Sequence, residues 1–399
     1  MSNRMHVVPL ALLRNHALLW KIFVALALLL CGASIALAGP REQAARIHDR
    51  LAGVPADEAT LNAMAATLPG NPVAAATIAM NNPSFYSVTL KNFVAPWTNR
   101  DQNPFVPLND YMTLVMGMVR DNVPFNQVLT TDLLYTGPGS VVPAPSPTSN
   151  AHFEALEERM REPTFNQSQL VQTTQMAVYG TPDGATAGVM TTRAAAEAFF
   201  IAGTNRAMFR FTLMNHMCMD MEQVHDTSIA PDRIRQDVSR SPGGDSRVFL
   251  NNCIGCHAGM DPLAQAFAYY DFDETTTRMV YNPSAVNPKY FNNNATFADG
   301  FVTPDDHWHN HWRQGQNALL GWSPTLPGEG IGARSLGQEL AGTQAFAQCQ
   351  VKKVFKAVCL RDPVDANDRN KVDAMTNTFR NAYNLKQVFA ESAGYCMGN

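Results

Sequence analysis

The chain has 399 residues, of which 30 are basic and 34 acidic, and it contains seven cysteines. Its formal net charge of −4 disfavours nucleic acid and anionic membrane surfaces as partners. The sequence contains no G-x-S-x-G, H-E-x-x-H or Walker motif, so hydrolase and nucleotide-binding functions have no support.

An export signal is predicted over residues 1–38. Three basic residues and no acidic one precede an apolar run over residues 22–30, and an A-x-A cleavage pattern ends at Ala38. An uncleaved membrane anchor is the alternative, because residues 22–38 are all apolar or small and reach the lower length limit of a spanning helix. Cleavage leaves 27 basic against 34 acidic residues, a formal charge of −7, which favours basic protein partners.

The N-terminal region, residues 39–136, is predicted to be a series of helices. Asp57 and Asn82 stand near helix starts, and apolar residues recur behind them at helical spacing. Residues 137–150 contain four prolines and are predicted to form a linker. The predicted helices of this region are 41–51, 56–68, a helix that opens at 82–84, 109–120 and 124–134.

The rest of the chain divides into a region that carries the candidate site, residues 151–330, and a C-terminal helical region, residues 331–399. Residues 258–330 are rich in Asn, Asp, Pro, Gly and aromatic residues without clear periodicity, which is typical of long loops around a site. The predicted fold class is therefore mainly α, a multi-helix protein with long irregular loops. The predicted helices here are 151–160, 192–201, 205–224, 335–359 and 367–391.

Cys253, Cys256 and His257 form a complete C-x-x-C-H motif, the attachment sequence of a c-type haem. The two thiols can form thioethers with the haem, and the histidine then becomes the proximal ligand of the iron. The same residues could instead form a redox dithiol, a disulfide, or half of a zinc site completed by histidines between residues 307 and 311. The export signal favours one covalently bound haem c over these alternatives.

The residues that follow the motif are expected to support the ring of His257. A backbone carbonyl near Asp261 would accept a hydrogen bond from the second ring nitrogen and so select one tautomer. Pro262 is expected to begin the next helix, where its missing amide hydrogen costs nothing.

The distal ligand of the iron is predicted from three alternatives. Met279 follows the motif by 22 residues, so a loop can bring its sulfur to the far face of the ring, and it is the favoured ligand. His307, His309 or His311 would give bis-histidine coordination, and an open position would suit small-ligand or peroxide chemistry. The methionines upstream of the motif recur at helical spacing, which is typical of core packing; they are Met214, Met217 and Met221.

Four cysteines remain after the motif and the signal are set aside, and an oxidising compartment favours disulfides between them. A helix over residues 343–360 would hold Cys349 and Cys359 about 15 Å apart, too far for a disulfide. That pairing is therefore disfavoured, and the pairings that include Cys218 or Cys396 stay open; among them we choose Cys359–Cys396.

The sequence resembles the planctomycete-type secreted cytochrome c proteins, a largely uncharacterised family in which C-x-x-C-H is followed shortly by D-P-L. The resemblance extends in order over about residues 41–395 and implies a helical, haem-bearing secreted protein without indicating a substrate. The matching stretches are 50–55, 253–257, Asp261-Pro262-Leu263, Tyr270-Asp271-Phe272-Asp273 and 346–355, ahead of Phe379 and Leu385.

Together these patterns predict a secreted, periplasmic or cell-surface monohaem c-type cytochrome that performs one-electron transfer with a redox partner protein, for which a basic surface is favoured. A membrane association is expected only if the N-terminal segment is not cleaved. The first alternative is a haem enzyme of the peroxidase or oxygenase type with an open distal position. The second is a binding or assembly protein in which the haem is structural.

Overall fold

A computed structural model of the chain describes residues 38–68, 70–201, 203–231, 233, 246–290 and 301–398. The predicted export signal lies outside these residues, apart from Ala38. The described part is mainly helical, as predicted, and no helix in it is both long and apolar enough to span a membrane. Its α-helices are α2 (Pro40–Ala52), α3 (Glu58–Thr67), α4 (Pro72–Met80), α5 (Lys91–Val94), α6 (Asp110–Asp121), α7 (Ala151–Met160), α8 (Gln175–Tyr179), α9 (Arg193–Phe199), α10 (Arg206–Met217), α11 (Ser246–Asn252), α12 (Ile254–Ala264), α13 (Gly332–Ala341), α14 (Gln344–Cys359), α15 (Ala366–Ala382) and α16 (Leu385–Tyr395).

The strands of the described residues form three separate two-stranded antiparallel sheets, which pair β1 with β2, β3 with β4 and β5 with β6. Short 3-10 or π segments connect many of the helices. The strands and short segments are β1 (Leu133–Thr136), β2 (Val171–Thr174), β3 (Tyr270–Asp273), β4 (Arg278–Tyr281), β5 (His307–His309), β6 (Glu329–Ile331), η1 (Phe85–Leu90), η2 (Ala95–Thr98), η3 (Phe125–Leu129), η4 (Gln167–Gln169), η5 (Asp183–Ala185), η6 (Gly188–Thr191), η8 (Gln265–Phe267), η9 (Pro288–Tyr290), η10 (His311–Arg313) and η11 (Gly315–Leu320).

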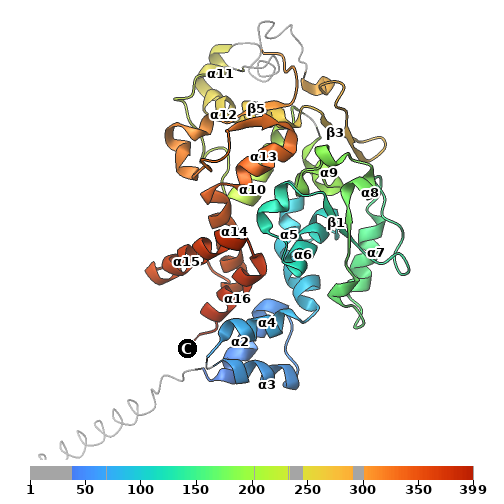
Figure 1. Ribbon diagram of the computed structural model, residues 1–399, viewed down its shortest axis with the longest axis vertical. Helices are drawn as coiled ribbons and strands as arrows, with labels where there is room; N and C mark the ends of the chain where they lie inside the picture. Colours follow the sequence, from blue (N-terminus) through green and yellow to red (C-terminus); the bar gives the residue numbers. More distant parts are fainter. Residues whose placement is uncertain are drawn as a thin grey trace, which may run out of the picture.

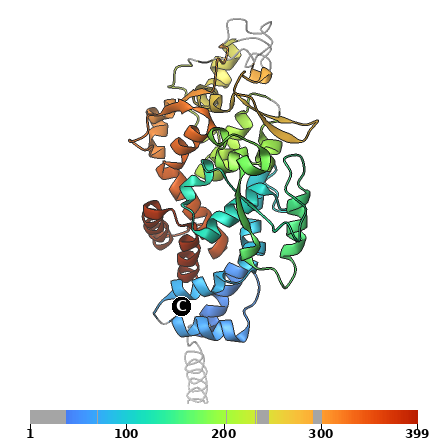
Figure 2. The ribbon, with the colours of Figure 1, turned by 45° about the vertical axis from the view of Figure 1, so that its right-hand side comes forward.

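The molecule is elongated, with α2, α3 and α4 at one end and α11, α12 and β5 towards the other (Figure 1). The same order is seen in the view of Figure 2. One hydrophobic cluster runs through it from Ala44 to Ala393 and includes buried residues on both sides of residues 137–150. In this segment, which was predicted as a linker, Gly137 donates its backbone N–H to Nε2 of His152 of α7, at 2.9 Å.

The first two helices match their predictions, and Asp57 caps α3 by accepting the backbone N–H of Thr60 at 2.7 Å. The sequence did not predict α4, whose alanines give it no amphipathic stripe; it packs against α2, α3 and α16. The helix predicted to open at residues 82–84 is found as one unbroken helical run over residues 84–98, in which η1, α5 and η2 follow one another.

The helix predicted over residues 124–134 is wrong in its second half. The segment forms the short η3 and then β1, which pairs with β2 from beyond α7. The ring of Tyr135 lies against α6 at Gly117, where an added Cβ would come within 2.1 Å of it. A strand partner nearly 40 residues away therefore overrides the local helical pattern.

Helix breaks in the second half of the chain were also missed. The predicted helix 205–224 ends at Met217, because Cys218 takes a left-handed conformation with φ of 56°. Each predicted C-terminal helix is two helices: α13 and α14 meet at Thr343, which caps α14, and α15 and α16 meet at Tyr383, which has φ of 51°.

Two disulfides join the described cysteines outside the motif. Cys359 pairs with Cys396, as predicted, with Cα atoms 5.5 Å apart. Cys218 pairs with Cys349, with Cα atoms 5.3 Å apart, and so ties the end of α10 to α14.

The two disulfides should contribute unequally to stability. They close loops of 131 and 37 residues, so loss of unfolded-state entropy predicts about 5 kcal/mol for Cys218–Cys349 and about 4 kcal/mol for Cys359–Cys396. Urea unfolding of the two double-alanine variants would measure these losses. A larger loss for the Cys359–Cys396 variant would contradict the loop-entropy account.

Candidate functional site

The candidate site lies between α10 and α12, which pack against each other. Asn205 precedes α10 with φ of 56°, and its side-chain amide donates hydrogen bonds to the carbonyls of Phe267 and Tyr270, at 2.8 and 2.9 Å. These bonds connect the start of α10 to the chain that follows α12. The two helices are thereby held side by side.

The C-x-x-C-H motif occupies the start of α12. Cys253 is the residue before the helix, and Cys256 and His257 lie in its first turn, so all three fall near one side of the helix. Between the cysteines, Gly255 has no room for a side chain, because a Cβ there would lie 2.1 Å from Nε2 of His225. The packing against His225 therefore requires a glycine at this position of the motif.

Both motif cysteines are outside any disulfide, whereas the other four described cysteines are all paired. Burial raises the pKa of the Cys256 thiol, and negative charge on Cys253, Glu222 and Asp220 adds to the increase. A redox-active dithiol needs a lowered pKa, so this environment does not favour one. Among the described residues, the histidine-rich group close enough to bind a metal includes neither cysteine, which also weakens the zinc interpretation.

His257 is oriented by a carboxylate. Its Nδ1 lies 3.1 and 3.2 Å from the two carboxylate oxygens of Asp261, whose side chain is 1% exposed. Because a carboxylate only accepts, Nδ1 carries the proton, and Nε2 is the nitrogen that can bind iron. The expected partner was a backbone carbonyl near Asp261, and the structure supplies the side chain of this residue instead.

Asp261 is itself held from the opposite helix. Arg206 of α10 binds it with two hydrogen bonds, at 2.6 Å from Nε and 3.0 Å from Nη2. Pro262 does not begin a new helix, as was expected, but lies inside α12. The helix continues through the proline and so places Asp261 one turn after His257, on the same side.

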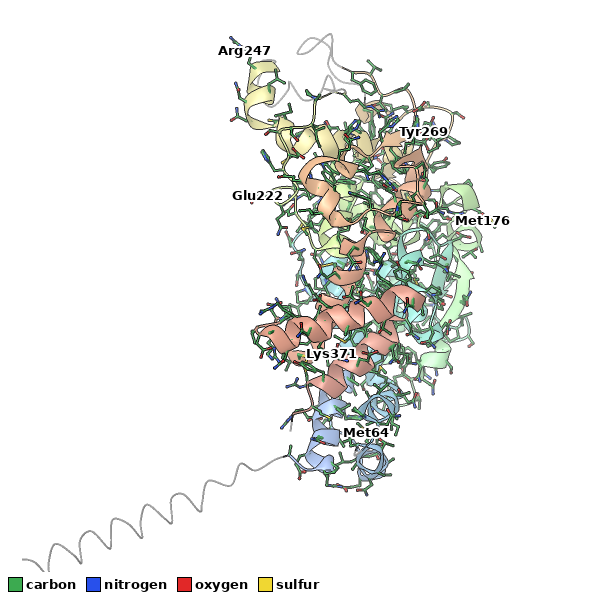
Figure 3. All side chains as sticks on the ribbon, turned by 60° about the vertical axis from the view of Figure 1, so that its left-hand side comes forward. Met64, Met176, Glu222, Arg247, Tyr269 and Lys371 are labelled. Atoms are coloured by element: carbon green, nitrogen blue, oxygen red, sulfur yellow. A yellow bond between two sulfur atoms is a disulfide. The ribbon has the colours of Figure 1, made fainter. Side chains whose placement is uncertain are left out.

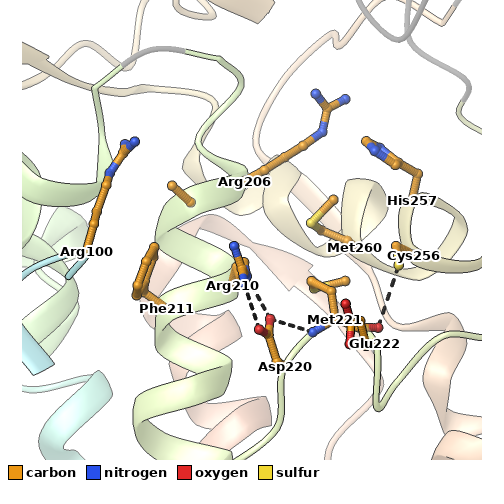
Figure 4. A pocket seen from close by; sticks show the side chains of 11 residues that line it. Arg100, Arg206, Arg210, Phe211, Asp220, Met221, Glu222, Cys256, His257 and Met260 are labelled. Carbon is orange, nitrogen blue, oxygen red and sulfur yellow. Dashed lines mark hydrogen bonds and ion pairs between the residues drawn. The ribbon is translucent and has the colours of Figure 1, made fainter. Parts of the chain in front are cut away.

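A cavity of about 680 Å³ opens beside His257 (Figure 4). This volume is within the ~300–1,000 Å³ range of small-molecule and cofactor sites. In Figure 3, Glu222 of the cavity wall and Arg247 of α11 lie on one side of the molecule, and Tyr269 lies towards the other. The lining residues are Arg100, Arg206, Ala207, Arg210, Phe211, Asp220, Met221, Glu222, Cys256, His257 and Met260.

The cavity wall combines apolar and cationic groups. Phe211, Met221 and Met260 supply apolar surface, and three guanidinium groups surround it. Arg210 is paired with Asp220 at 2.7 Å, while Arg100 donates to the carbonyls of Ala198 and Ile201. An apolar ring with carboxylate substituents and two thiol-reactive vinyl groups, which is a haem, fits this set of residues.

The structure does not bring the predicted distal ligands into this cavity. Met279 lies on β4, opposite Phe272 of β3, in a hairpin that packs against α9. His307 and His309 lie on β5 and His311 in η10, and none of them lines the cavity. Met221, which its helical spacing assigned to core packing, does line it, although it lies beyond the end of α10 and not within it.

Sequence reasoning missed the charged residues of the site. Arg206 and Arg210 are four positions apart on a predicted helix, which was a usable signal for a shared cationic face. Asp261 is likewise four positions from His257, but the expected helix start at Pro262 concealed this relation. Arg100 comes from a distant segment and had no signal in the sequence.

In the comparisons with known proteins, no family model, curated protein or solved structure matches this chain.

Proposed function

We propose that this protein is a secreted monohaem c-type cytochrome that transfers single electrons. In this proposal Cys253 and Cys256 hold one haem c covalently and His257 binds its iron. The observation that carries the proposal is the pair of thiols outside any disulfide at the start of α12, of which Cys256 lines the cavity together with His257, whereas Cys253 is not among the lining residues. The two disulfides elsewhere support an oxidising compartment outside the cytoplasm.

When bound, the haem supplies a one-electron ferrous–ferric couple. The chain contributes orientation and charge: Asp261 keeps the proton of His257 on Nδ1 and so presents Nε2 to the iron. Arg100 places positive charge at the cavity, where the two haem carboxylates need compensation, and Arg206 holds Asp261 in place. Phe211 and Met260 exclude water from part of the wall.

We further propose Met221 as the distal ligand, in place of the expected Met279. Among the cavity-lining residues outside α12, Met221 is the one whose side chain is a usual axial ligand of haem iron. Met260 follows His257 by three positions on the same helix and so belongs to the proximal side. A thioether ligand raises the reduction potential and suits electron transfer.

A haem enzyme is the second candidate function, and the contact between Asp261 and His257 favours it. A carboxylate partner makes the imidazole a more basic ligand than a carbonyl does, which stabilises oxidised iron. Arg210 of α10 also lines the cavity, and none of the α10 residues that line it has a side chain that is a usual ligand of haem iron. If Met221 does not bind the iron, a small ligand can occupy the sixth position.

Carbon monoxide binding separates the two candidates. We expect the reduced haem-loaded protein to have a low-spin absorption spectrum that carbon monoxide does not change, because Met221 occupies the sixth position. Met221→Ala should make the iron bind carbon monoxide rapidly. Met279→Ala is the matched control and should leave the spectrum unchanged.

Two outcomes would overturn parts of this proposal. Rapid carbon monoxide binding by the unaltered protein would favour the haem enzyme. A spectrum that changes in Met279→Ala and not in Met221→Ala would return the distal ligand to the residue predicted from the sequence. Reversible one-electron titration of the unaltered protein tests the carrier function itself.

A further inference from the structure

The sheet formed by β5 and β6 presents two histidines on one face. Side chains alternate across a strand, so His307 and His309 lie on the face opposite to Trp308. Trp308 is buried, and its indole N–H donates to the hydroxyl of Ser335 at 2.8 Å. The tryptophan therefore anchors the strand to α13 and leaves both imidazoles partly exposed.

A carboxylate completes this group from the neighbouring strand. Glu329 stands directly opposite His309 in the register of the sheet, and Nδ1 of His309 lies 3.0 Å from its carboxylate. The rings of His307 and His309 have centroids 4.6 Å apart. Each of the three residues offers one ligand atom, and these three atoms all lie within 4.8 Å of one another.

We propose that His307, His309 and Glu329 bind one divalent transition-metal ion of the Zn²⁺ type. Zinc binds imidazole nitrogen and carboxylate oxygen at about 2.0–2.2 Å, which places neighbouring ligand atoms roughly 3.3 Å apart. The His309–Glu329 contact already has about this separation, and the ion would replace the Nδ1 proton that the carboxylate accepts. Small rotations of the side chains bring in His307.

The type of ion follows from the donor atoms. Calcium and magnesium prefer sites made of oxygen, whereas two imidazoles with one carboxylate suit zinc and its neighbours in the first transition row. Three protein ligands leave a fourth position for water or a further ligand.

This site is separate from the proposed haem. None of its three residues lines the cavity beside His257, although β5 packs against α12. The same histidines were candidate distal ligands of the haem iron. As zinc ligands they should affect zinc affinity and not the haem spectrum, and as haem ligands they should do the reverse. Zinc affinity and haem absorption can therefore be measured on one set of variants.

The test uses the full haem-loaded chain without a histidine tag, freed of metals with a chelator and dialysed. Elemental analysis and competition with a zinc-binding dye should find one tightly bound Zn²⁺ per chain in addition to the haem iron. Glu329→Gln and His309→Ala should each weaken zinc binding at least about 100-fold, more than the loss of an outer-shell partner. Their side chains are 52% and 32% exposed, so we expect both variants to fold.

Glu274→Gln, which alters an exposed glutamate in the turn between β3 and β4, is the matched control and should bind zinc like the unaltered protein. Equal zinc binding by the unaltered protein and by Glu329→Gln would overturn the proposal. So would a changed haem spectrum in His309→Ala with unchanged zinc affinity, because the histidine would then be a ligand of the haem iron.

Discussion

The double variant Cys253→Ala/Cys256→Ala should lose all covalently bound haem. The proposed attachment consists of two thioether bonds, one from each motif cysteine. The other four described cysteines already form disulfides: Cys218 with Cys349, and Cys359 with Cys396. No other described thiol is therefore available to replace them. Haem staining of the protein after denaturing electrophoresis measures the covalent fraction, and each single variant should keep one thioether and a weaker stain.

The double variant Cys359→Ala/Cys396→Ala is the matched control for this experiment. It also removes two cysteines, but these form the disulfide that joins α14 to the end of α16. We expect it to be less stable and to keep the full haem stain. A stain that persists when both motif cysteines are absent would show that the haem assignment is wrong.

Asp261→Asn should cause the next largest change, a loss of stability, because the buried carboxylate of Asp261 accepts hydrogen bonds from two partners. The carboxylate of Asp261 accepts two hydrogen bonds from Arg206 and one from His257, and its side chain is 1% exposed. An amide can still accept from the imidazole but cannot compensate the arginine. Breaking a buried ion pair in this way costs about 3–5 kcal/mol.

The same substitution should raise the reduction potential of the haem. A neutral amide makes His257 a less basic ligand, which removes part of the preference for oxidised iron. Each tenfold loss of that preference corresponds to about 59 mV for a one-electron couple. Spectroelectrochemical titration and urea unfolding of the haem-loaded variant measure the two effects.

Asp362→Asn provides the comparison. Asp362 pairs with Lys356 at 2.9 Å on the surface, where both side chains are more than half exposed, so its loss should cost no more than about 1 kcal/mol. It should leave the potential unchanged. If Asp261→Asn changes the free energy of unfolding and the reduction potential as little as this surface variant does, the contacts of Asp261 with Arg206 and His257 contribute to neither property.

Helices with a clear apolar stripe were predicted well from the sequence. The predictions for α2, α6 and α7 agree with the structure to within a residue or two, because periodicity is a local property, and Asn109 also caps α6. The breaks at Thr343 and Tyr383 were missed because the apolar pattern continues across them. The strand β1 was missed because its stability comes from a partner strand distant in the sequence.

In the candidate site, too, the residues that depend on a local pattern were predicted and those that depend on folding were not. Cys253, Cys256 and His257 were identified because their chemistry depends on a fixed spacing along the chain. The distal ligand was assigned to Met279 by its distance along the sequence, but folding places Met279 in a hairpin against α9 and Met221 at the cavity. Distance along the chain does not determine which methionine lies beside the motif.

The sequence by itself determined the mainly helical class and the C-x-x-C-H motif, since helical periodicity and residue spacing are sufficient for each. The Cys359–Cys396 pair was a choice among the pairings that spacing left open, and the structure confirms it. Only the tertiary structure decided which residues surround His257. Asp261 and Arg206 are 55 positions apart, and Arg100 comes from still further away. Their approach depends on the packing of α10 against α12, a long-range contact that no local pattern encodes.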